Sequence, residues 1–317
     1  MPDRAGPLVV IAGPTASGKS ALALDLAEAL AGTVINGDSM QIYAGLGEIT
    51  AAPGPAETAR LPHRLYGVRD PALGGSVAWW LDAAAEAVAE ARAAGRLPIV
   101  VGGTGLYLKA LIEGLADLPE VPEAARQAAR ADLEALGAAG LHARLAEVDG
   151  PTAGRLAPND RQRIVRAWEV WRATGRPLSH WQAEAIPRRR IAGPVFLIAL
   201  RPPREAVHRA AEVRLRAMFD GAAPAEVAAL MARGLPPDTP ALKAIGVVEI
   251  AAWQRGEMSR EAALAAAQQA TRRYVKRQMT WLATQMRPNM VVPAQYSESL
   301  LPDMLRKVRA FLLTAGD

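Results

Sequence analysis

Short runs of consecutive apolar residues alternate with longer stretches of helical periodicity in much of the chain. The apolar runs are LVVIA at 8–12, TVI at 33–35, LPIVV at 97–101 and VFLIAL at 195–200. Between them, ALALDLAEAL and the Ala-rich stretch 77–95 have apolar residues at helical spacing, and the latter ends at Gly95. Strands that are apolar on both faces and alternate with helices predict a parallel α/β sheet. Ligands bind such sheets at the carboxyl ends of the strands.

The pattern changes near Asp117, where a Pro-bearing stretch leads into residues that are almost entirely helical in character. This helical region is interrupted at Gly137, Gly150 and Gly175. Asn159 is predicted to cap a helix that ends at Gly175. No usable motif occurs after residue 288. The predicted domains are an α/β core at 1–116 and 191–317 and a helical insertion domain at 117–190.

Composition excludes several classes of protein. The chain has 317 residues and no Cys, which excludes a disulfide framework, a Cys-ligated metal site and a thiol nucleophile. Its four His residues do not show the spacing of a metal site. The sequence shows neither a membrane-spanning apolar stretch nor a signal peptide, which predicts a cytoplasmic protein without membrane contact. A monomer is the default expectation.

Basic residues are concentrated in two acid-poor segments. The net charge is +5, from 37 Lys and Arg against 32 Asp and Glu. Residues 161–190 hold eight Arg and two acidic residues, and residues 271–287 hold five basic residues and no acid. Such segments suit a nucleic acid backbone, especially where aromatic residues such as Tyr274 and Trp281 are interleaved. The alternative is that these charges lie on a solvated helix face. In the first segment the predicted apolar ridge of such a helix comprises Val165, Trp168 and Trp171.

A phosphate-binding motif follows the first predicted strand and precedes the first predicted helix. It is Gly13-Pro14-Thr15-Ala16-Ser17-Gly18-Lys19-Ser20, which fits the pattern G-x-x-x-x-G-K-[ST]. In this pattern backbone N–H groups surround phosphate oxygens, and the positive end of the helix faces the same anion. Lys19 adds a point charge, and the Ser20 hydroxyl is a candidate Mg²⁺ ligand. The motif predicts a bound di- or triphosphate without specifying which.

Two further polar groups lie just beyond predicted strands. Asp38 follows the second run, where a carboxylate facing a diphosphate can act as a general base or in a metal shell. Thr104 follows the third run within a Gly-rich turn, where its hydroxyl can donate to a phosphate oxygen. The structural alternatives are a helix N-cap at Asp38 and a tight strand-to-helix turn at Thr104. We expect both residues at the sheet edge that carries the phosphate-binding loop.

Six motifs in one order resemble a known family. They are GPTASGKS, DSMQIY, GGTGLYLKAL, NDRQRIVRAWEV, KAIGVVEI and TRRYVKRQMTWL. Together they resemble the tRNA dimethylallyltransferases, also called tRNA isopentenyltransferases, over residues 8–287. The resemblance implies an α/β fold with a P-loop NTPase/kinase-like parallel sheet core and a helical insertion domain.

The resemblance also implies an activity. Members of the family transfer a dimethylallyl group from dimethylallyl diphosphate to N6 of the adenosine just 3′ of the anticodon, at tRNA position 37. The tRNAs concerned read codons that begin with U, and the enzyme grips their anticodon stem-loop. The family requires Mg²⁺, and its P-loop holds the diphosphate of the prenyl donor rather than ATP.

Roles for individual residues follow from the same resemblance. Asp38 matches the general base, Thr104 a residue at the reaction centre, and Arg214 an arginine that pairs with the diphosphate held by 13–20. Ser20 is the implied Mg²⁺ ligand. The implied tRNA-binding residues, besides Asp38 and Thr104, are Ser39, Met40, Gln41, Arg126, Gln162, Arg163, Ile164, Val165, Arg166, Lys243, Gly246, Lys276, Arg277, Gln278 and Trp281.

Two stretches depart from the family pattern. Ala52 replaces a usual lysine in a segment that also reads Ile49-Thr50 instead of Gly-Thr, and Val247 and Val248 stand where Tyr and Arg are usual. Each change removes a polar group that could contact RNA. The departures therefore concern tRNA affinity rather than the chemistry.

Three other functions share parts of this pattern. A P-loop kinase of small metabolites or nucleotides would need a second phosphate-acceptor site and an Arg-rich lid, and it would not need two basic patches. An RNA-binding protein with the P-loop as a switch does not explain Asp38 and Thr104 at one edge. An isopentenyltransferase of free adenine nucleotides is closer, but the insertion and the basic C-terminal helices favour tRNA.

Overall fold

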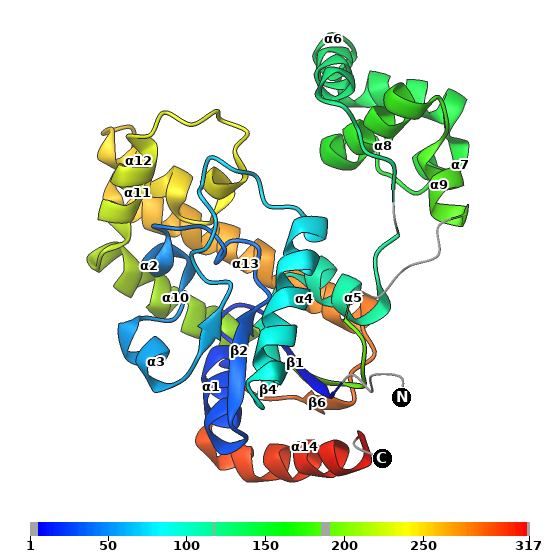
Figure 1. Cartoon of the computed structure of the whole chain (residues 1–317). Helices are drawn as coiled ribbons and strands as arrows, with labels where there is room; N and C mark the ends of the chain where they lie inside the picture. Colours follow the sequence, from blue (N-terminus) through cyan, green and yellow to red (C-terminus); the bar gives the residue numbers. More distant parts are fainter. Residues whose placement is uncertain (1–5, 117, 185–190, 316–317) are drawn as a thin grey trace. The chain divides into compact units, whose positions relative to one another are not determined.

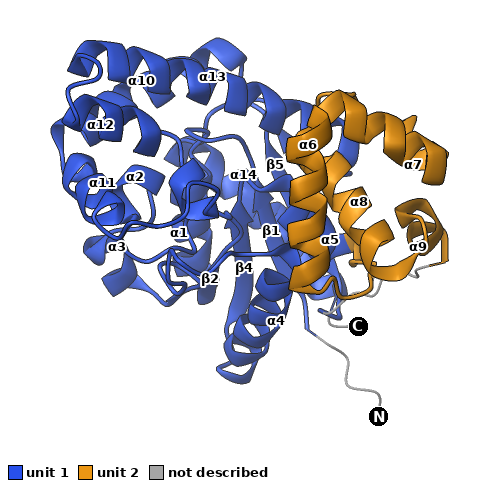
Figure 2. Ribbon diagram, turned by 90° about the horizontal axis from the view of Figure 1, so that it is seen from above, with its two compact units in different colours: residues 1–112, 189–317 blue, residues 113–188 orange. Residues whose placement is uncertain are grey.

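The computed structural model describes residues 6–116, 118–184 and 191–315. The chain forms two compact units, coloured blue and orange in Figure 2. Unit 1 comprises residues 1–112 and 189–317, and unit 2 comprises residues 113–188. The sequence-based division at 116/117 and 190/191 runs within a few residues of these limits. Unit 2 is thus a single insertion into the chain of unit 1.

Unit 1 is built on a parallel β-sheet (Figure 1). Its strands are β1 Leu8–Ala12, β2 Gly32–Asn36, β3 His63–Arg64, β4 Leu97–Gly102, β5 Val195–Leu200 and β6 Met290–Val292. Their order across the sheet is β3-β2-β4-β1-β5-β6, and all neighbours pair in parallel. The four predicted apolar runs form the central strands, so the predicted parallel α/β core is confirmed. β6 lies in the stretch for which the sequence offered no motif.

Helices surround this sheet. Those of unit 1, with α5 running to its boundary, are α1 Lys19–Ala29, α2 Gly47–Thr50, α3 Pro55–Arg60, α4 Val77–Ala93, α5 Gly105–Glu113, α10 Arg204–Asp220, α11 Ala223–Met231, α12 Val247–Gln254, α13 Arg260–Gln285 and α14 Leu301–Ala315, with 3₁₀ turns η1 Pro240–Lys243 and η2 Glu298–Leu300. Across the described ranges, no helix has the combined length and apolar character needed to cross a bilayer.

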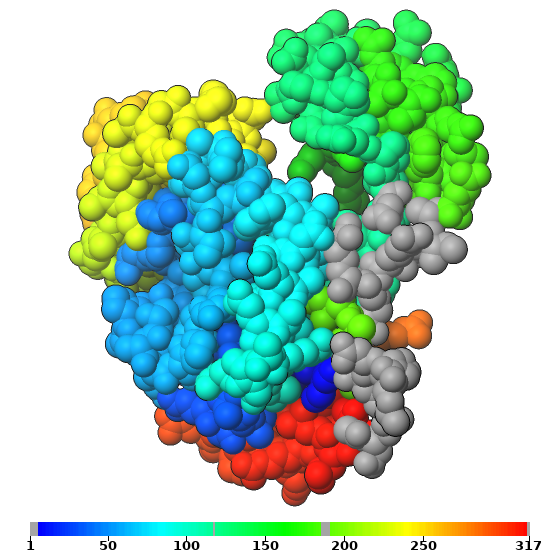
Figure 3. Space-filling view, viewed as in Figure 1, coloured from blue at the N-terminus to red at the C-terminus, as the bar shows by residue number. Residues whose placement is uncertain are grey.

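One face of the sheet is covered by the first and last helices of the chain. Val9 and Ile11 of β1 belong to a buried cluster that includes Leu22 of α1 and Met304 of α14. In Figure 3 the red surface of α14 lies beside the blue surface of α1. Helix α14 therefore contributes to the core of unit 1.

The opposite face carries α4 against the strands that lead to the candidate site. Trp80 of α4 is fully buried and stacks on Tyr107 of α5, with ring centroids 4.6 Å apart. Its Nε1 donates to the carbonyl of Asn36, the last residue of β2, at 2.8 Å. This bond satisfies a buried indole donor and fixes the end of β2.

Unit 2 is a small helical unit with its own apolar core. Its helices are α6 Glu123–Val148, α7 Gly150–Ala153, α8 Arg161–Thr174 and α9 Leu178–Glu184. Gly137 interrupts α6 with a φ of 68° and a ψ of 173°, and Gly175 ends α8 in the left-handed conformation, both as the glycine pattern predicted. Gly150, in contrast, begins α7.

Two local predictions in unit 2 were wrong by one residue. Asp160 caps α8, not Asn159, because its Oδ1 accepts from Arg163 N at 3.3 Å. The apolar stripe of α8 that faces the core comprises Ile164, Ala167 and Val170, instead of Val165, Trp168 and Trp171. Trp168 lies at the edge of this core, where its Nε1 reaches Asp132 Oδ2 at 2.6 Å.

Candidate functional site

Three loops that carry predicted residues follow neighbouring strands. The phosphate-binding loop follows β1, Asp38 lies in the loop after β2, and Thr104 follows β4, which pairs with both strands. Since all three strands are parallel, their carboxyl ends share one sheet edge. The expected juxtaposition of these loops is confirmed.

The phosphate-binding loop is tightly curled. Ala16 and Gly18 have left-handed backbone conformations, with φ values of 60° and 86°. A Cβ at position 18 would also lie 2.8 Å from the Cβ of Tyr296. Both the backbone conformation and the lack of space therefore require glycine at this position. The curl leaves the first N–H groups of α1, which have no intrahelical acceptor, at the mouth of the loop.

Not every amide of this loop is available to an anion. Thr15 N donates to Gln278 Oε1 at 2.9 Å, and Ser17 N donates to the carbonyl of Pro14 at 3.3 Å. Pro14 itself has no N–H. An anion in the loop must therefore be bound by the amides from Gly18 onward, by Ala16 and by side chains.

Lys19 is the first residue of α1 and lies in an environment that disfavours its charge. Burial lowers the pKa of Lys19 from 10.5 to about 8; the carboxylate of Asp38 opposes this change, and Arg214 adds to it. Its Nζ lies 3.4 Å from the carbonyl oxygen of Pro14, a long hydrogen bond. A phosphate anion would compensate the poorly hydrated ammonium group.

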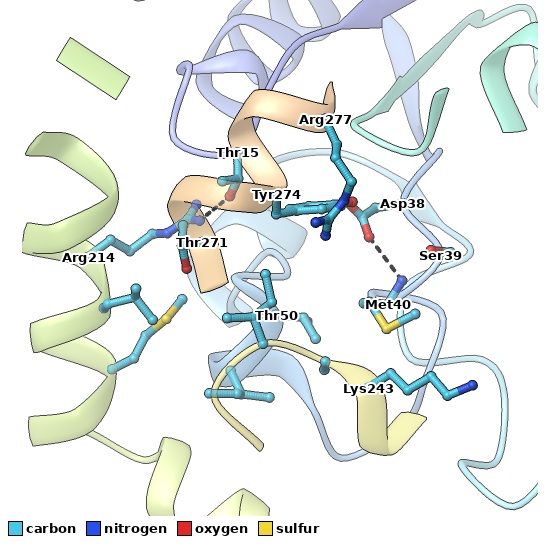
Figure 4. Close-up of a pocket in the computed structure, with 15 residues that line it drawn as sticks. Thr15, Asp38, Ser39, Met40, Thr50, Arg214, Lys243, Thr271, Tyr274 and Arg277 are labelled. Atoms are coloured by element: carbon cyan, nitrogen blue, oxygen red, sulfur yellow. Dashed lines mark hydrogen bonds between the residues drawn. The ribbon is translucent and has the colours of Figure 1, made fainter. Parts of the chain in front are cut away.

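Arg214, on α10, reaches the same loop from the side. Its Nη2 donates to Thr15 Oγ1, as Figure 4 shows. Its Nε is buried and has no hydrogen-bond partner among the described residues. Burial lowers the pKa of Arg214 below its ordinary value, while the carboxylate of Asp38 opposes this change. An orphaned buried donor is costly, and a phosphate oxygen is the acceptor that suits a guanidinium group.

Asp38 is held by a turn rather than a helix. Its Oδ1 accepts from Met40 N at 2.9 Å, and its N–H donates to Asn36 Oδ1 at 2.8 Å. The nearest following helix begins at Gly47. The N-cap interpretation of Asp38 was therefore wrong, because the side chain closes an Asx-type turn, and the residue lines the cavity.

Thr104 connects two of the loops. Its Oγ1 accepts from Ser39 N at 2.9 Å and donates to Ser39 Oγ at 3.2 Å. Its carbonyl accepts the N–H groups of Tyr107 and Leu108 and so starts α5. The strand-to-helix turn foreseen as an alternative is thus present, and the hydroxyl additionally fixes the backbone beside Asp38.

A cavity of about 220 Å³ lies against these loops. Figure 4 shows Thr15 and Arg214 on one side of it, Asp38 and Met40 on the other, and Tyr274 between them. The lining residues are Thr15, Asp38, Ser39, Met40, Ile49, Thr50, Arg214, Leu215, Met218, Lys243, Ala244, Ile245, Thr271, Tyr274 and Arg277. The cavity therefore joins an anion-binding side, a carboxylate side and an apolar wall.

Tyr274 was noted in the sequence only as an aromatic residue in a basic segment, and it is central to the cavity. Burial raises the pKa of Tyr274, and so does the carboxylate of Asp38, while Thr104, Arg277 and Gln278 oppose this change. The phenol therefore stays neutral and can donate a hydrogen bond beside Asp38. Thr271, one turn earlier on α13, also lines the cavity and carried no signal in the sequence.

Two residues predicted to contact RNA have internal roles. Gln278 is 5% exposed, and besides accepting from Thr15 it donates from Nε2 to the carbonyl of Gly103 at 3.0 Å. Trp281 packs directly against Gly105, where a Cβ would clash with the indole ring. Both ends of the Gln278 amide make internal hydrogen bonds, and its contact with RNA stays a prediction.

Gln41 and Gly246 support the walls of the cavity. Gln41 Nε2 donates to the carbonyls of Thr50 and Ala51 at 2.9 and 2.8 Å, so this end of its amide is not available to a base. Gly246 caps α12 with a φ of 100°, and a Cβ there would lie 2.7 Å from Cδ1 of Ile49. Both residues hold the segment that carries Ile49 and Thr50.

The basic residues of α13 lie on its exposed side. Lys276 and Arg277 are exposed, and the guanidinium carbon of Arg277 lies 5.5 Å from the ring centroid of Tyr274. Arg277 also lines the cavity, as does the exposed Lys243. These charges are placed for a polyanion that enters the cavity from solvent.

Within unit 2, the predicted RNA contacts divide between surface and core. Arg126, Gln162 and Arg163 are exposed, and Val165 and Arg166 are half-buried. Ile164 is fully buried in the core, so its predicted RNA contact is wrong for the side chain. Arg163 and Arg166 border a surface hollow that is also lined by Leu118, Thr152, Arg155, Leu156, Leu178 and Gln182.

The described residues contain no group of three or more His, Asp or Glu side chains arranged for a metal ion. Ser20 is exposed on the first turn of α1, directly after Lys19. A single hydroxyl beside a phosphate-binding loop fits a Mg²⁺ ion that takes its other ligands from phosphate oxygens and water.

Comparison with known proteins identifies the family of the chain. A family model described as IPP transferase matches residues 41–285. The chain belongs to the IPP transferase family. A tRNA dimethylallyltransferase of Phenylobacterium zucineum (strain HLK1) is 56% identical over 277 residues, covering 87% of this chain and 89% of its own. One from Rhodospirillum rubrum is 52% identical over 314 residues, covering 98% and 96%.

Among solved structures, a tRNA isopentenylpyrophosphate transferase of Bacillus halodurans matches with a TM-score of 0.69 at 30% identity, covering 98% of each chain. Membership of the IPP transferase family confirms the resemblance indicated by the motifs. The family model begins after the phosphate-binding loop and Asp38 and ends before β6. The contacts of the phosphate-binding loop, Asp38 and β6 are therefore known from the structure and not from this match.

Proposed function

We propose that this member of the IPP transferase family is a tRNA dimethylallyltransferase. It transfers the dimethylallyl group of dimethylallyl diphosphate to N6 of the adenosine 3′ of the anticodon, giving N6-isopentenyladenosine. One observation carries the proposal. A single cavity joins the phosphate-binding loop, with Lys19 and Arg214, to the turn that presents Asp38 beside Thr104. The relatives that share half of its sequence are named for this activity.

The anion-binding side suits the leaving group. The bond between C1 of the donor and its diphosphate oxygen breaks, and negative charge develops on the diphosphate. Lys19, Arg214 and the amides at the start of α1 are donors directed to that position. Because they gain most from the developing charge, they stabilise the transition state more than the ground state. The buried Nε of Arg214 would gain an acceptor when the diphosphate binds.

The carboxylate side suits the nucleophile. The new bond forms between N6 and C1, and N6 loses a proton for which Asp38 is the proposed base. Thr104 holds the backbone of Ser39 and thereby the turn of Asp38. Ile49, Leu215 and Met218 line the apolar wall, which keeps water from an allylic carbon with cationic character. The adenine must leave the stacked anticodon loop to enter.

Mg²⁺ is the proposed cofactor. Ser20 would hold the ion together with diphosphate oxygens and water, which is the ligand set Mg²⁺ prefers. When bound, such an ion neutralises charge on a phosphate leaving group. The positive side chains of Lys19 and Arg214 would neutralise part of the same charge on the leaving group.

The proposed RNA partner is the anticodon stem-loop of tRNAs that read codons beginning with U. Exposed basic residues would meet its backbone: Lys243 and Arg277, which line the cavity, and Lys276, which precedes Arg277 on α13. In unit 2 the proposed contacts are Arg126, Gln162, Arg163 and Arg166. Met40 and Ser39 would lie against the adenine. We further propose a cytoplasmic monomer, since the substrate is itself the large partner.

One pair of incubations tests this function against a P-loop kinase. Labelled dimethylallyl diphosphate with tRNA is expected to give prenylated tRNA that depends on Mg²⁺. ATP with adenine nucleotides or small metabolites is expected to give no phosphoryl transfer. Prenylation of free AMP at a rate equal to that of tRNA would instead identify an enzyme of free nucleotides. Phosphoryl transfer without prenylation would overturn the proposal.

Replacing Arg163 and Arg166 by Ala is expected to weaken tRNA binding and leave donor binding unchanged. Each lost phosphate contact should flatten the slope of log affinity against log salt by about 0.7–0.9. Titration of labelled tRNA at several salt concentrations measures this slope. Arg144→Ala is the matched control, because Arg144 is an exposed residue of α6 whose nearest acidic partner, Glu147, lies 3.9 Å away. Equal slopes in all variants would make the Arg163 surface a solvated helix face.

A further inference from the structure

The segment that follows β6 contacts the outer side of the phosphate-binding loop. Gln295 Nε2 donates to the carbonyl of Ala16 at 2.9 Å, and Tyr296 N donates to the carbonyl of Ser17 at 3.1 Å. Both residues are about 280 positions away in sequence from the loop that they contact. They lie beyond residue 285, where the match to the family model ends.

These two bonds determine which way the loop's amides face. In a trans peptide the carbonyl and the N–H point in opposite directions. The carbonyl of Ser17 is held outward by Tyr296, so the N–H of Gly18, in the same peptide, is directed to the inner side. The carbonyl that Gln295 holds belongs to Ala16, whose φ of 60° is disfavoured for a residue with a Cβ. External bonds are what maintain such a conformation in the absence of an anion.

The same segment is tied to the helix that follows the loop. Tyr296 Oη donates to Asp25 Oδ2 on α1 at 2.6 Å. The side chain of Tyr296 also packs against the core cluster between the sheet and α14. One residue therefore holds the loop through its backbone and holds α1 through its side chain, so their relative position is fixed.

The inner side of the loop is held by a different element. Gln278 of α13 accepts from Thr15 N and donates to the carbonyl of Gly103 in the loop after β4. The phosphate-binding loop thus lies between Gln278 on one side and residues 295–296 on the other. Its curled shape is specified by hydrogen bonds from the C-terminal part of the chain as well as by its own glycines.

We propose that Gln295 and Tyr296 are positioning residues of the diphosphate site, which they keep preformed in the free protein. The proposal rests on the proposed function of the loop as the site of the donor's diphosphate. It assigns a role to the segment after β6, for which the sequence offered none. Neither residue lines the cavity, so they act through Ala16, Ser17 and Gly18.

Gln295→Leu tests the proposal, because leucine is similar in size and cannot donate to Ala16. The dissociation constant for inorganic pyrophosphate with Mg²⁺ should rise about 2- to 12-fold, the worth of one hydrogen bond. The KM for dimethylallyl diphosphate should rise by the same factor, with the KM for tRNA unchanged. Gln295→Glu, which keeps the length but loses the donor, should bind pyrophosphate no better than Gln295→Leu. Tyr296→Phe keeps the backbone bond to Ser17 and loses only the bond from Oη to Asp25, so it should weaken pyrophosphate binding by a smaller factor than Gln295→Leu.

Gln254→Leu is the matched control. Gln254 Nε2 donates to the carbonyl of Pro224 at 2.7 Å, a bond of the same type on α12. Urea unfolding of both variants should show similar losses of stability, whereas only Gln295→Leu should weaken pyrophosphate binding. Equal pyrophosphate affinity in the two variants and the wild type would overturn the proposal. A wild type that binds pyrophosphate but does not prenylate tRNA would overturn the proposed function and leave this inference intact.

Discussion

Lys19→Ala is expected to lower kcat/KM for dimethylallyl diphosphate by about 10²–10³-fold, or ~2.7–4 kcal/mol of transition-state stabilisation. The ammonium group stands at the start of α1, where burial already disfavours its charge. In the free protein the Nζ of Lys19 donates to the carbonyl of Pro14 over a long 3.4 Å. The diphosphate is thus the partner that compensates the charge, and it does so increasingly as the C1–O bond breaks. Single-turnover prenylation of tRNA at saturating donor separates this effect from a loss of donor binding.

The control for this prediction is Lys307→Ala. Lys307 is an exposed residue of α14 in the same unit, with Asp303 as its ionic partner at 3.6 Å. Both variants remove one lysine, so a general effect of charge on tRNA affinity would appear in both. Near-normal turnover of a folded Lys19→Ala protein would contradict the assignment of the loop to the leaving group.

The parts of the fold that were predictable from the sequence depend on local signals. A run of five buried apolar residues, a glycine pattern and a Lys-Ser pair at a helix start lie within 8–20, and no distant contact is needed to interpret them. The same holds for Asp38 and Thr104, which follow strands directly. Parallel pairing then brings them to one edge.

The parts that were not predictable depend on contacts between distant residues. Gln278 sits in a basic, aromatic segment and resembled an RNA contact, yet it bonds to Thr15, 263 positions earlier. Gln295 and Tyr296 belong to no motif, because their bonds are to backbone carbonyls, which carry no sequence signature. Composition indicates which residues are polar, but not which of them find an internal partner.

The prediction of the buried stripe of α8 was wrong by one residue for a related reason. The stripe at Ile164 and the stripe at Val165 both recur at helical spacing, so periodicity alone admits either as the buried one. The structure buries the aliphatic stripe and leaves Trp168 at the edge, where its Nε1 finds Asp132. At this edge the polar indole nitrogen has an acceptor, which the apolar core of unit 2 would not offer it.

Asp38→Asn is expected to lower kcat by about 10²–10⁴-fold, the usual worth of general base catalysis. The structure makes this substitution a selective one. Oδ1 of Asp38 accepts from Met40 N, and the amide oxygen of Asn can accept the same bond and keep the turn. The backbone bond to Asn36 is unaffected by the substitution. What is lost is the charge and the capacity to take the N6 proton near neutral pH.

Three explanations of Asp38 then predict different results. A general base predicts a large fall in kcat with dissociation constants for tRNA and donor nearly unchanged, because the group acts in the transition state. A role in the metal shell predicts that raised Mg²⁺ restores activity. A purely structural role in the turn predicts a loss of about 1 kcal/mol or less in stability and normal kinetics, since Asn and Asp both favour such turns.

Single-turnover prenylation of one tRNA across a Mg²⁺ series distinguishes these outcomes. Ser39→Ala is the companion variant, because it removes the hydroxyl that accepts from Thr104 but leaves the backbone bond from Ser39 N to Thr104 Oγ1. It should therefore cost far less than Asp38→Asn if the carboxylate is the chemical group and the Ser39–Thr104 contact only supports it. Full activity of Asp38→Asn at every Mg²⁺ concentration would exclude Asp38 as the base.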